Sequence, residues 1–304
     1  MKILFVRSGN TGEIKSYIKE QAESLAALNV EIEFFVINGK GIIGYLKNLF
    51  ALRQKILLSK IELVHAHYGL SGFLSILQRK APVVITFHGS DINIWWVRII
   101  SSIAARFADK SIFVSEHLAK QLKLKSYDVI PCGVDRKTFS PIDKYLAREK
   151  LGFDVKKNII LFTSSFDNKV KNFPLAKKAL ELTGISFQII ELKGFSRGEI
   201  NLLLNAADLV LLTSHSEGSP QIIKEAMACN CPIVATDVGD IKEVISGTKN
   251  CYITSFNPTE VARKIKQVLE VKERADGSDK IEKFDNRLIA EKIISVYKEI
   301  LQKN

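Results

Sequence analysis

A stretch in the C-terminal third, SEGSPQIIKEAMACNCPIV from Ser216 to Val234, places two glutamates beside the expected start of a helix. Ser219 is expected to be the N-cap of this helix. Pro220 is expected at its first position, where the missing N–H of proline costs no hydrogen bond. The peptide N–H groups that follow have no partner inside a helix and suit a phosphate or pyrophosphate. They belong to Gln221, Ile222 and Ile223.

The two carboxylates lie on either side of this anion position. Gly218 has no side chain, so a ligand can approach the loop backbone. Glu225, just over one turn into the helix, can accept hydrogen bonds from a vicinal diol such as ribose, and Glu217 can accept from hydroxyls on the other side. A nucleotide sugar has this order of groups. Glutamates near a helix N-terminus also stabilise the helix dipole by about 0.3–1 kcal/mol, so a purely structural role stays open at this point.

Strand-like apolar runs alternate with helical patterns along the chain. The runs are continuously apolar, as expected for strands buried on both faces of a parallel sheet. Between the first two runs, residues 12–29 have apolar side chains at helical spacing, which predicts a helix. This alternation predicts an α/β fold with parallel sheets. The expected strands are 2–6, 31–37, 63–67, 83–88, 111–115 and 128–132, followed by 158–164, 186–192, 209–214, 231–236 and 251–254.

The chain of 304 residues suits two domains, and the pattern pauses at 131–141, where glycine, aspartate and two prolines indicate a linker. We expect an acceptor-binding domain at 1–135 and a donor-binding domain at 142–285. The last 20 residues predict a further amphipathic helix, about 286–304, which we expect to pack on the first domain. Ligands of such sheets bind outside the carboxyl ends of the strands.

The net charge is +11, and most of it lies in residues 1–140, which hold 19 basic and 11 acidic side chains. Residues 40–60 contain five basic residues, no acidic ones, and apolar residues at helical spacing. Such a helix either lies on an anionic membrane or faces the core with a solvated basic side. No apolar run is long enough to span a bilayer, and the N-terminus is typical of a first strand. We therefore expect a cytoplasmic protein, and a peripheral position on the cytoplasmic face of the membrane stays open.

Several segments resemble a known family. The segment EGSPQIIKEAMACNCPIV resembles the E-x7-E motif of the retaining glycosyltransferases of family 4, which have the GT-B fold of two Rossmann-like domains around a cleft. VIPCGVDRKTFSP resembles their interdomain segment, and TFHGSD resembles their His-Gly loop. The resemblance covers the whole chain in the right order. It implies a hexosyltransferase (EC 2.4) that moves a sugar from a UDP- or GDP-sugar to a glycan or lipid-linked acceptor, in cell-surface polysaccharide or glycolipid synthesis.

The resemblance also assigns roles in the donor site. It implies that Glu225 holds the donor ribose, that Glu217 and the amides after it contact the sugar and diphosphate, and that Lys171 neutralises the diphosphate. The family often has an arginine where this chain has Ser165, so one diphosphate cation is replaced or missing. Candidates for the replacement are Lys169 and Arg7. The segment before 209 is also shorter than usual, which leaves the choice among UDP, GDP and ADP open.

In the first domain, the resemblance implies that His88 reaches the donor sugar and that Asp91 belongs to the same loop. Gly12 matches the glycine loop near the diphosphate and acceptor. His65 and His67 are expected at a strand end facing the cleft, where they contact the acceptor or are structural. His88, Lys171 and Glu217 are the expected catalytic residues.

The expected reaction needs no metal, because the chain has no D-x-D motif and helix amides with Lys171 can stabilise the leaving diphosphate. The resemblance implies retention of configuration, with the leaving phosphate accepting the proton of the acceptor hydroxyl. Two alternatives stay open: an enzyme like UDP-N-acetylglucosamine 2-epimerase, which shares the fold, and a basic nucleic-acid-binding protein. Against the last, the basic residues are not interleaved with a stacking platform of aromatic side chains, so we expect no nucleic-acid partner.

Overall fold

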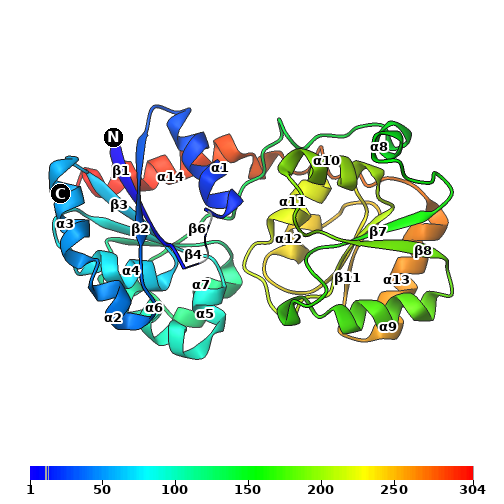
Figure 1. Ribbon diagram of the computed structural model, residues 1–304, viewed down its shortest axis with the longest axis horizontal. Helices are drawn as coiled ribbons and strands as arrows, with labels where there is room; N and C mark the ends of the chain where they lie inside the picture. The colour runs from blue at the N-terminus through cyan, green and yellow to red at the C-terminus, as the bar shows by residue number, and fades with distance from the viewer. Residues whose placement is uncertain (11, 13, 304) are drawn as a thin grey trace. The chain divides into compact units, whose positions relative to one another are not determined.

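The computed structural model describes residues 1–10, 12 and 14–303. The chain divides into two compact units (Figure 1). Unit 1 consists of 1–133 together with 286–304, and unit 2 of 134–285. Within the described residues, no helix is both long enough and apolar enough to span a membrane.

Unit 1 is built on a parallel sheet with the strand order β2-β1-β3-β4-β5-β6. The six strands predicted for this half of the sequence are confirmed. The last is shorter than predicted, because Pro131 follows it closely and has no N–H to donate to a neighbouring strand. The strands are β1 Lys2–Ser8, β2 Glu31–Ile37, β3 Leu63–His67, β4 Val83–Phe87, β5 Lys110–Phe113 and β6 Asp128–Val129.

Helices cover both faces of this sheet. On one face lie α1 (Ser16–Ala26) and α14 (Asn286–Leu301), packed against Ile3 and Phe5 (Figure 1). On the other face lie helices that pack against Leu4 and Val6. These are α2 (Gly41–Leu46), α3 (Leu49–Leu58), α4 (Gly69–Ile76), α6 (Trp95–Phe107) and α7 (Glu116–Leu122), with the short α5 (Ser90–Asn93) before α6.

The basic segment 40–60 forms two helices where the sequence predicts one. Asn48, between α2 and α3, donates from Nδ2 to the carbonyl oxygens of Gly44 (2.7 Å) and Asn38 (2.9 Å). These bonds fix a turn, which ends α2 and starts α3 on a new axis. Leu52 and Ile56 of α3 are buried against the sheet.

Unit 2 has a five-stranded parallel sheet with the order β11-β10-β9-β7-β8. All five predicted strands are confirmed, at β7 Asn158–Phe162, β8 Phe187–Glu191, β9 Leu209–Leu212, β10 Ile233–Thr236 and β11 Cys251–Thr254. α9 (Phe173–Thr183) and α13 (Pro258–Val271) cover one face. The other face carries α10 (Arg197–Ala206), α11 (Gln221–Ala228) and α12 (Ile241–Ile245). The remaining helical segments are α8 (Lys144–Leu151), η1 (Lys169–Lys171) and η2 (Glu282–Phe284).

The strand order reverses once in each sheet. In unit 1 the chain passes from β2, on one side of β1, to β3 on the other side. In unit 2 it passes from β8, on one side of β7, to β9 on the other side. At such a point the connections leave in opposite directions, which opens a crevice at the carboxyl ends of the two middle strands. The two crevices lie between β1 and β3 and between β7 and β9.

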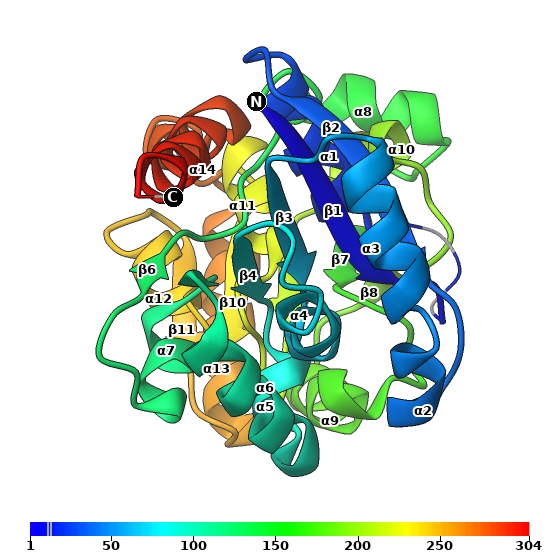
Figure 2. The ribbon, with the colours of Figure 1, turned by 90° about the vertical axis from the view of Figure 1, so that its left-hand side faces the viewer.

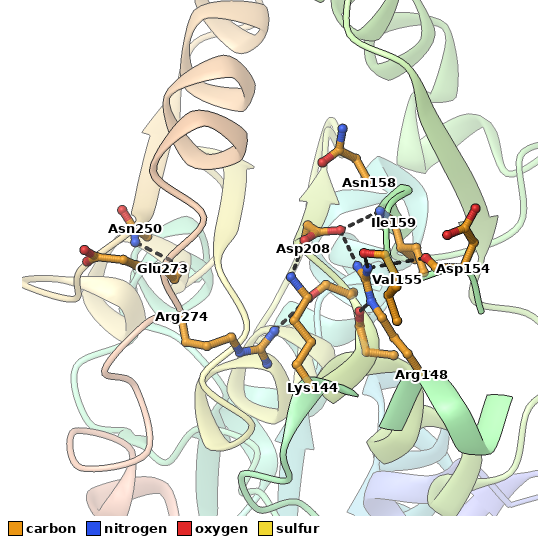
Figure 3. Close-up of polar contacts among 12 residues, drawn as sticks. Lys144, Arg148, Asp154, Val155, Asn158, Ile159, Asp208, Asn250, Glu273 and Arg274 are labelled. Carbon is orange, nitrogen blue, oxygen red and sulfur yellow. Dashed lines mark hydrogen bonds and ion pairs between the residues drawn. The ribbon is translucent and has the colours of Figure 1, made fainter. Parts of the chain in front are cut away.

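An ion cluster around Asp208 lies at the amino ends of the strands of the second sheet (Figure 3). Its carboxylate accepts hydrogen bonds from Arg148 Nη2 and from the backbone N–H of Ile159, both at 2.6 Å, and also pairs with Lys144. Asp208 directly precedes β9 and Ile159 lies at the start of β7. The cluster therefore joins α8 to the amino ends of these strands, and it stabilises the fold at the end remote from the crevice.

Candidate functional site

Lys171 and Glu217 meet at the carboxyl ends of β7 and β9. Lys171 Nζ lies 2.6 Å from Glu217 Oε1, and Ser214 Oγ donates to the same oxygen at 2.6 Å. Thr213 Oγ1 donates to the carbonyl oxygens of Lys171 and Asn172, both at 3.0 Å. The residues after β9 thus hold the loop after β7 in place, and a cation and a carboxylate share the crevice of unit 2.

Helix α11 starts one residue later than the sequence predicts. Gln221 is its first residue and Pro220 occupies the N-cap position without a side-chain cap. The backbone N–H of Ile223 donates to the Pro220 carbonyl oxygen at 3.2 Å, so the prediction that this N–H is unpaired is wrong.

Ser219 is not the cap, because a buried lysine engages its hydroxyl. Lys224 is fully buried, and its Nζ lies 2.5 Å from Ser219 Oγ and 3.0 Å from Asp240 Oδ2. Ser219 Oγ in turn donates to Asp240 at 2.5 Å. A buried ammonium group needs an anion and further hydrogen-bond acceptors, and Asp240 and Ser219 provide them for Lys224. Among the described residues, the other Asp240 oxygen, Oδ1, is buried without a hydrogen-bond partner. The trio fixes the loop before α11 against the start of α12.

The loop that contains Gly218 packs closely against the loop after β10. Gly239, after β10, has a φ of +63°, and a Cβ atom there would lie 2.6 Å from the Gly218 carbonyl oxygen. Thr236 Oγ1 donates to the Ser214 carbonyl oxygen at 2.9 Å. The segment from Ser214 to Ser219 therefore rests on the loop after β10 and is held in one conformation.

Glu225 is nearly fully buried and is paired with a residue that the sequence analysis missed. Arg197 Nη1 lies 2.7 Å from Glu225 Oε1, and the Arg197 guanidinium lies 4.5 Å from the centre of the Phe139 ring. The sequence does contain a local signal, since Ser196 and Glu199 form a capping box that makes Arg197 the first residue of α10. Its partner on another helix could not be read from the sequence.

Ser165 follows β7 and provides no positive charge. Its Oγ donates to Asp167 at 2.5 Å, and this hydrogen bond, with the charge of Lys193, lowers the pKa of the Asp167 carboxyl. The structure thus brings Lys171 to Glu217 and Arg197 to Glu225. It places Ser165 in a separate polar turn.

Unit 1 has a cavity of about 520 Å³ at the crevice between β1 and β3. Arg7, at the end of β1, donates from Nη1 to the carbonyl oxygens of Ser8 and Gly12, both at 3.1 Å. Gly12 has a φ of +75°, a conformation that glycine adopts at no steric cost. The polar part of the lining comes from Arg7, Ser8, Asn10, Lys15, Ser90 and Asp91.

Asp91 holds the His-Gly loop together. Its carboxylate accepts the backbone N–H groups of Gly89 (2.8 Å), His88 (3.1 Å) and Gly69 (3.2 Å). Burial raises the pKa of Asp91 to about 6, against the opposing effect of these hydrogen bonds. The carboxylate thereby ties the loop after β4 to the start of α4. Its contact with an acceptor stays a prediction.

His65 does not face the crevice at the strand end, contrary to the sequence expectation; of its two expected roles, the structural one fits the contacts of its ring. It is fully buried, with Nδ1 2.5 Å from the Tyr297 hydroxyl of α14 and Nε2 2.7 Å from Thr86 Oγ1. Both ring nitrogens are therefore hydrogen-bonded. Residues 65 and 67 alternate along β3 with residues that face α4, so their side chains point to the other face of the sheet, which α14 covers. Burial lowers the pKa of His65 to about 3.

His67 and His88 form a second pair. His67 is fully buried, its Nδ1 lies 3.1 Å from His88 Nε2, and the two rings are stacked. Burial lowers the pKa of His88 to about 3 and that of His67 well below its ordinary value, so both rings are neutral at pH 7. Within the described residues, His88 Nδ1 is buried and has no hydrogen-bond partner.

Two tyrosines flank the His88 ring. The centres of the Tyr17 and Tyr68 rings lie 5.0 Å and 4.7 Å from that of His88, and the two hydroxyls are hydrogen-bonded to each other. Tyr68 has a φ of +72°, which is strained for a residue with a bulky side chain. Such strain is tolerated where the surroundings fix the conformation, often at functional sites.

Comparisons with known proteins identify the family. Residues 15–138 match the model described as Glycosyltransferase Family 4, and residues 167–271 match the model described as Glycosyl transferases group 1. The chain belongs to glycosyltransferase family 4. One curated relative of this glycosyltransferase is the uncharacterized glycosyltransferase MJ1178 of Methanocaldococcus jannaschii, 28% identical over 85% of this chain and 81% of the relative. The chain spans 52–59% of the length of seven further curated relatives that it matches.

Solved structures share the fold of this glycosyltransferase. Sucrose-phosphate synthase (tll1590) from Thermosynechococcus elongatus superposes with a TM-score of 0.88 at 16% identity, over 100% of both chains. Anabaena Alr3699/HepE in complex with UDP-glucose superposes with a TM-score of 0.79 at 19% identity, over 98% of this chain and 100% of that one. These confirm the predicted α/β fold with two parallel Rossmann-like sheets of the GT-B type. Among the described residues, no cluster of three His, Cys, Asp or Glu side chains is arranged to hold a metal ion.

Proposed function

We propose that this glycosyltransferase binds a nucleotide sugar in unit 2 and transfers the sugar, with retention, to a glycan or lipid-linked acceptor. The observation that carries the proposal is the pairing of Lys171 with Glu217 at the crevice between β7 and β9, directly before α11. The Anabaena structure with UDP-glucose, which has the same fold, is consistent with a donor of this class.

In the proposed complex, the diphosphate binds beside Lys171 and the loop before α11. In the absence of an anion, the Lys171 ammonium group is held by Glu217 and is therefore already in place. A diphosphate would compete for this ammonium group and release Glu217 to accept hydrogen bonds from the donor sugar. Glu225, oriented by Arg197, would accept from the ribose hydroxyls.

The proposed step breaks the bond between sugar C1 and the diphosphate oxygen, with the electron pair leaving on that oxygen. The acceptor oxygen forms its bond to C1 on the same face, and its proton passes to the leaving phosphate oxygen. Lys171 lowers the barrier because negative charge grows on the diphosphate in the transition state. His88 is neutral and has an unpaired, buried Nδ1, so we assign it a hydrogen bond to a sugar hydroxyl without transfer of charge.

A donor screen tests this proposal. The full chain is incubated with UDP-, GDP- and ADP-hexoses without acceptor, and sugar release is measured, because a transferase slowly hydrolyses its own donor. We expect hydrolysis of one nucleotide class and binding of the free nucleoside diphosphate by calorimetry. The absence of nucleotide binding for all three classes would contradict the proposal. Conversion of UDP-N-acetylglucosamine to its 2-epimer would favour the epimerase alternative.

A further inference from the structure

Two neighbouring helices of unit 1 turn apolar side chains toward solvent. α3 and α6 lie on the same face of the first sheet with α4 between them (Figure 2), and their buried residues pack in the same core. Arg53 of α3 donates to carbonyl oxygens at the end of α4, and Ser101 of α6 lies against Gly69 of α4. The sides of α3 and α6 that face away from the sheet therefore form parts of one outer surface.

That outer surface is apolar to an unusual degree. Single exposed apolar residues are normal on a soluble protein, but here large ones recur at helical spacing on both helices. We define the α3/α6 face by Phe50 (71% exposed), Leu57 (59%), Leu58 (82%), Trp95 (68%), Ile99 (56%), Ile103 (40%) and Phe107 (74%).

The charges carried by the helices of this face are positive. The segments α2, α3, α4 and α6 contain no aspartate or glutamate. Lys47, Arg98 and Arg106 are exposed around the apolar residues. Of the neighbouring acids, Asp91 is buried, Glu33 is paired with Lys55 of α3, and the exposed Asp109 accepts from the backbone N–H of Val83. Apolar residues surrounded by cations complement an anionic lipid surface, where tryptophan also prefers the level of the headgroups.

A groove lies beside this face and is lined by Trp96 and Ile100, the neighbours in sequence of Trp95 and Ile99 on α6. It has a volume of about 220 Å³, runs between α2 and α6, and is floored by α4. Its lining includes Tyr45, Leu70 and Trp96, which also line the larger cavity that contains Arg7 and Lys15. An apolar path thus leads from the outer surface to a cationic cavity at the crevice of unit 1.

We propose that the α3/α6 face docks on an anionic lipid bilayer. Phe50, Leu57 and Trp95 enter the headgroup region, while Arg98 and Arg106 contact lipid phosphates. The exposed cations around the face outnumber the exposed acids, which favours an anionic lipid surface over a protein partner of the same shape. Docking in this orientation turns the groove toward the lipid, so the acceptor carries an apolar group. This consequence rests on the proposed transfer, whereas docking itself does not.

The chain contains two tryptophans, Trp95 and Trp96, and both belong to α6, so intrinsic fluorescence reports on this surface directly. The full chain is mixed with vesicles of phosphatidylcholine alone or with phosphatidylglycerol, at low and high salt. We expect co-sedimentation and a blue shift of the emission with the anionic vesicles at low salt, and weaker binding at high salt.

Two double variants remove apolar contacts and keep both tryptophans. Phe50→Ser with Leu57→Ser on α3, and Ile99→Ser with Ile103→Ser on α6, are each expected to weaken vesicle binding by about tenfold or more. The matched control is Tyr145→Ser with Leu146→Ser on α8, an equally exposed apolar pair in unit 2, and it is expected to bind as the wild type does.

Three outcomes would overturn the docking proposal: no vesicle binding at low salt, binding by both double variants that equals that of the wild type, or a wild-type dimer that these variants dissociate. In the last case the face is covered by a second copy of the chain. Donor hydrolysis without vesicles is measured in parallel and is expected to be the same in wild type and variants. Its absence in the wild type would count against the proposed transfer and leave the vesicle result unaffected.

Discussion

At the residue scale, Lys171 is the group on which the proposed leaving-group chemistry depends. Lys171→Ala removes the positive charge beside the diphosphate, and we expect kcat to fall about 10²- to 10³-fold, the usual loss for one stabilising donor at a charged transition state. Lys171→Arg keeps the charge and is expected to retain a larger share of the rate. The measurement is steady-state donor hydrolysis, and equal rates in wild type and Lys171→Ala would remove Lys171 from the site.

Glu225 allows a sharper test at the same scale, because its proposed ligand is a pair of hydroxyl groups. Each hydrogen bond to a charged group contributes about 1.5–3 kcal/mol, so the wild type should bind a nucleoside diphosphate at least about tenfold more tightly than its 2′,3′-dideoxy analogue. Glu225→Gln should bind both weakly and with nearly equal affinity. Calorimetry measures the four affinities. If the variant discriminates as well as the wild type does, Glu225 does not contact the ribose.

Some residues of the candidate site could be predicted from the sequence, and others could not. Local patterns placed Glu217 in the loop after a strand and Glu225 in the helix that follows, whereas Lys171 was predicted through the resemblance to family 4. Arg197 could not be predicted, since its partner Glu225 lies on a different helix. His65 was misplaced because periodicity shows that residues 65 and 67 share a face but not which face carries α14.

At the element scale, the strands could be predicted because their sequences are apolar on both faces. The start of α11 was predicted one residue too early. A serine before a proline predicts an N-cap, but Lys224 and Asp240 compete for the hydroxyl of Ser219. Lys224 and Asp240 are also widely separated in sequence. Local rules fail where a buried charge outweighs a capping bond of about 1 kcal/mol.

The same trio gives a prediction about stability. Lys224→Met leaves the Asp240 carboxylate buried without its cation and is expected to destabilise unit 2 by about 3–5 kcal/mol, whereas Lys224→Met combined with Asp240→Leu is expected to recover most of the loss. Urea unfolding followed by circular dichroism measures both. An equal loss in the single and double variants would show that packing, not charge, is what Lys224 provides.

At the scale of the whole molecule, the two units are expected to respond differently to acid. His65 and His88 have pKa values lowered to about 3 by burial, and His67 is lowered as well. In the unfolded chain they titrate near 6.5, so between pH 6.5 and about 3 the unfolded state binds more protons. Over this range, each histidine lowers the free energy of unfolding by about 1.4 kcal/mol for every unit by which the pH falls.

Asp91 acts in the opposite direction, because its pKa is raised to about 6 and its protonation favours the folded state below that pH. One carboxyl opposes three imidazoles, so the net effect is a loss of stability in unit 1 below pH 6.5. Unit 2 contains no buried histidine, because its single histidine, His215, is exposed. Hydrogen exchange resolved by peptide, at pH 7.5 and at pH 5 after correction for the intrinsic exchange rate, should show β3 and β4 losing protection before β7 and β9. The reverse order would mean that the three histidines are hydrated in the folded protein, which would also remove the argument that His88 acts as a neutral hydrogen-bonding group.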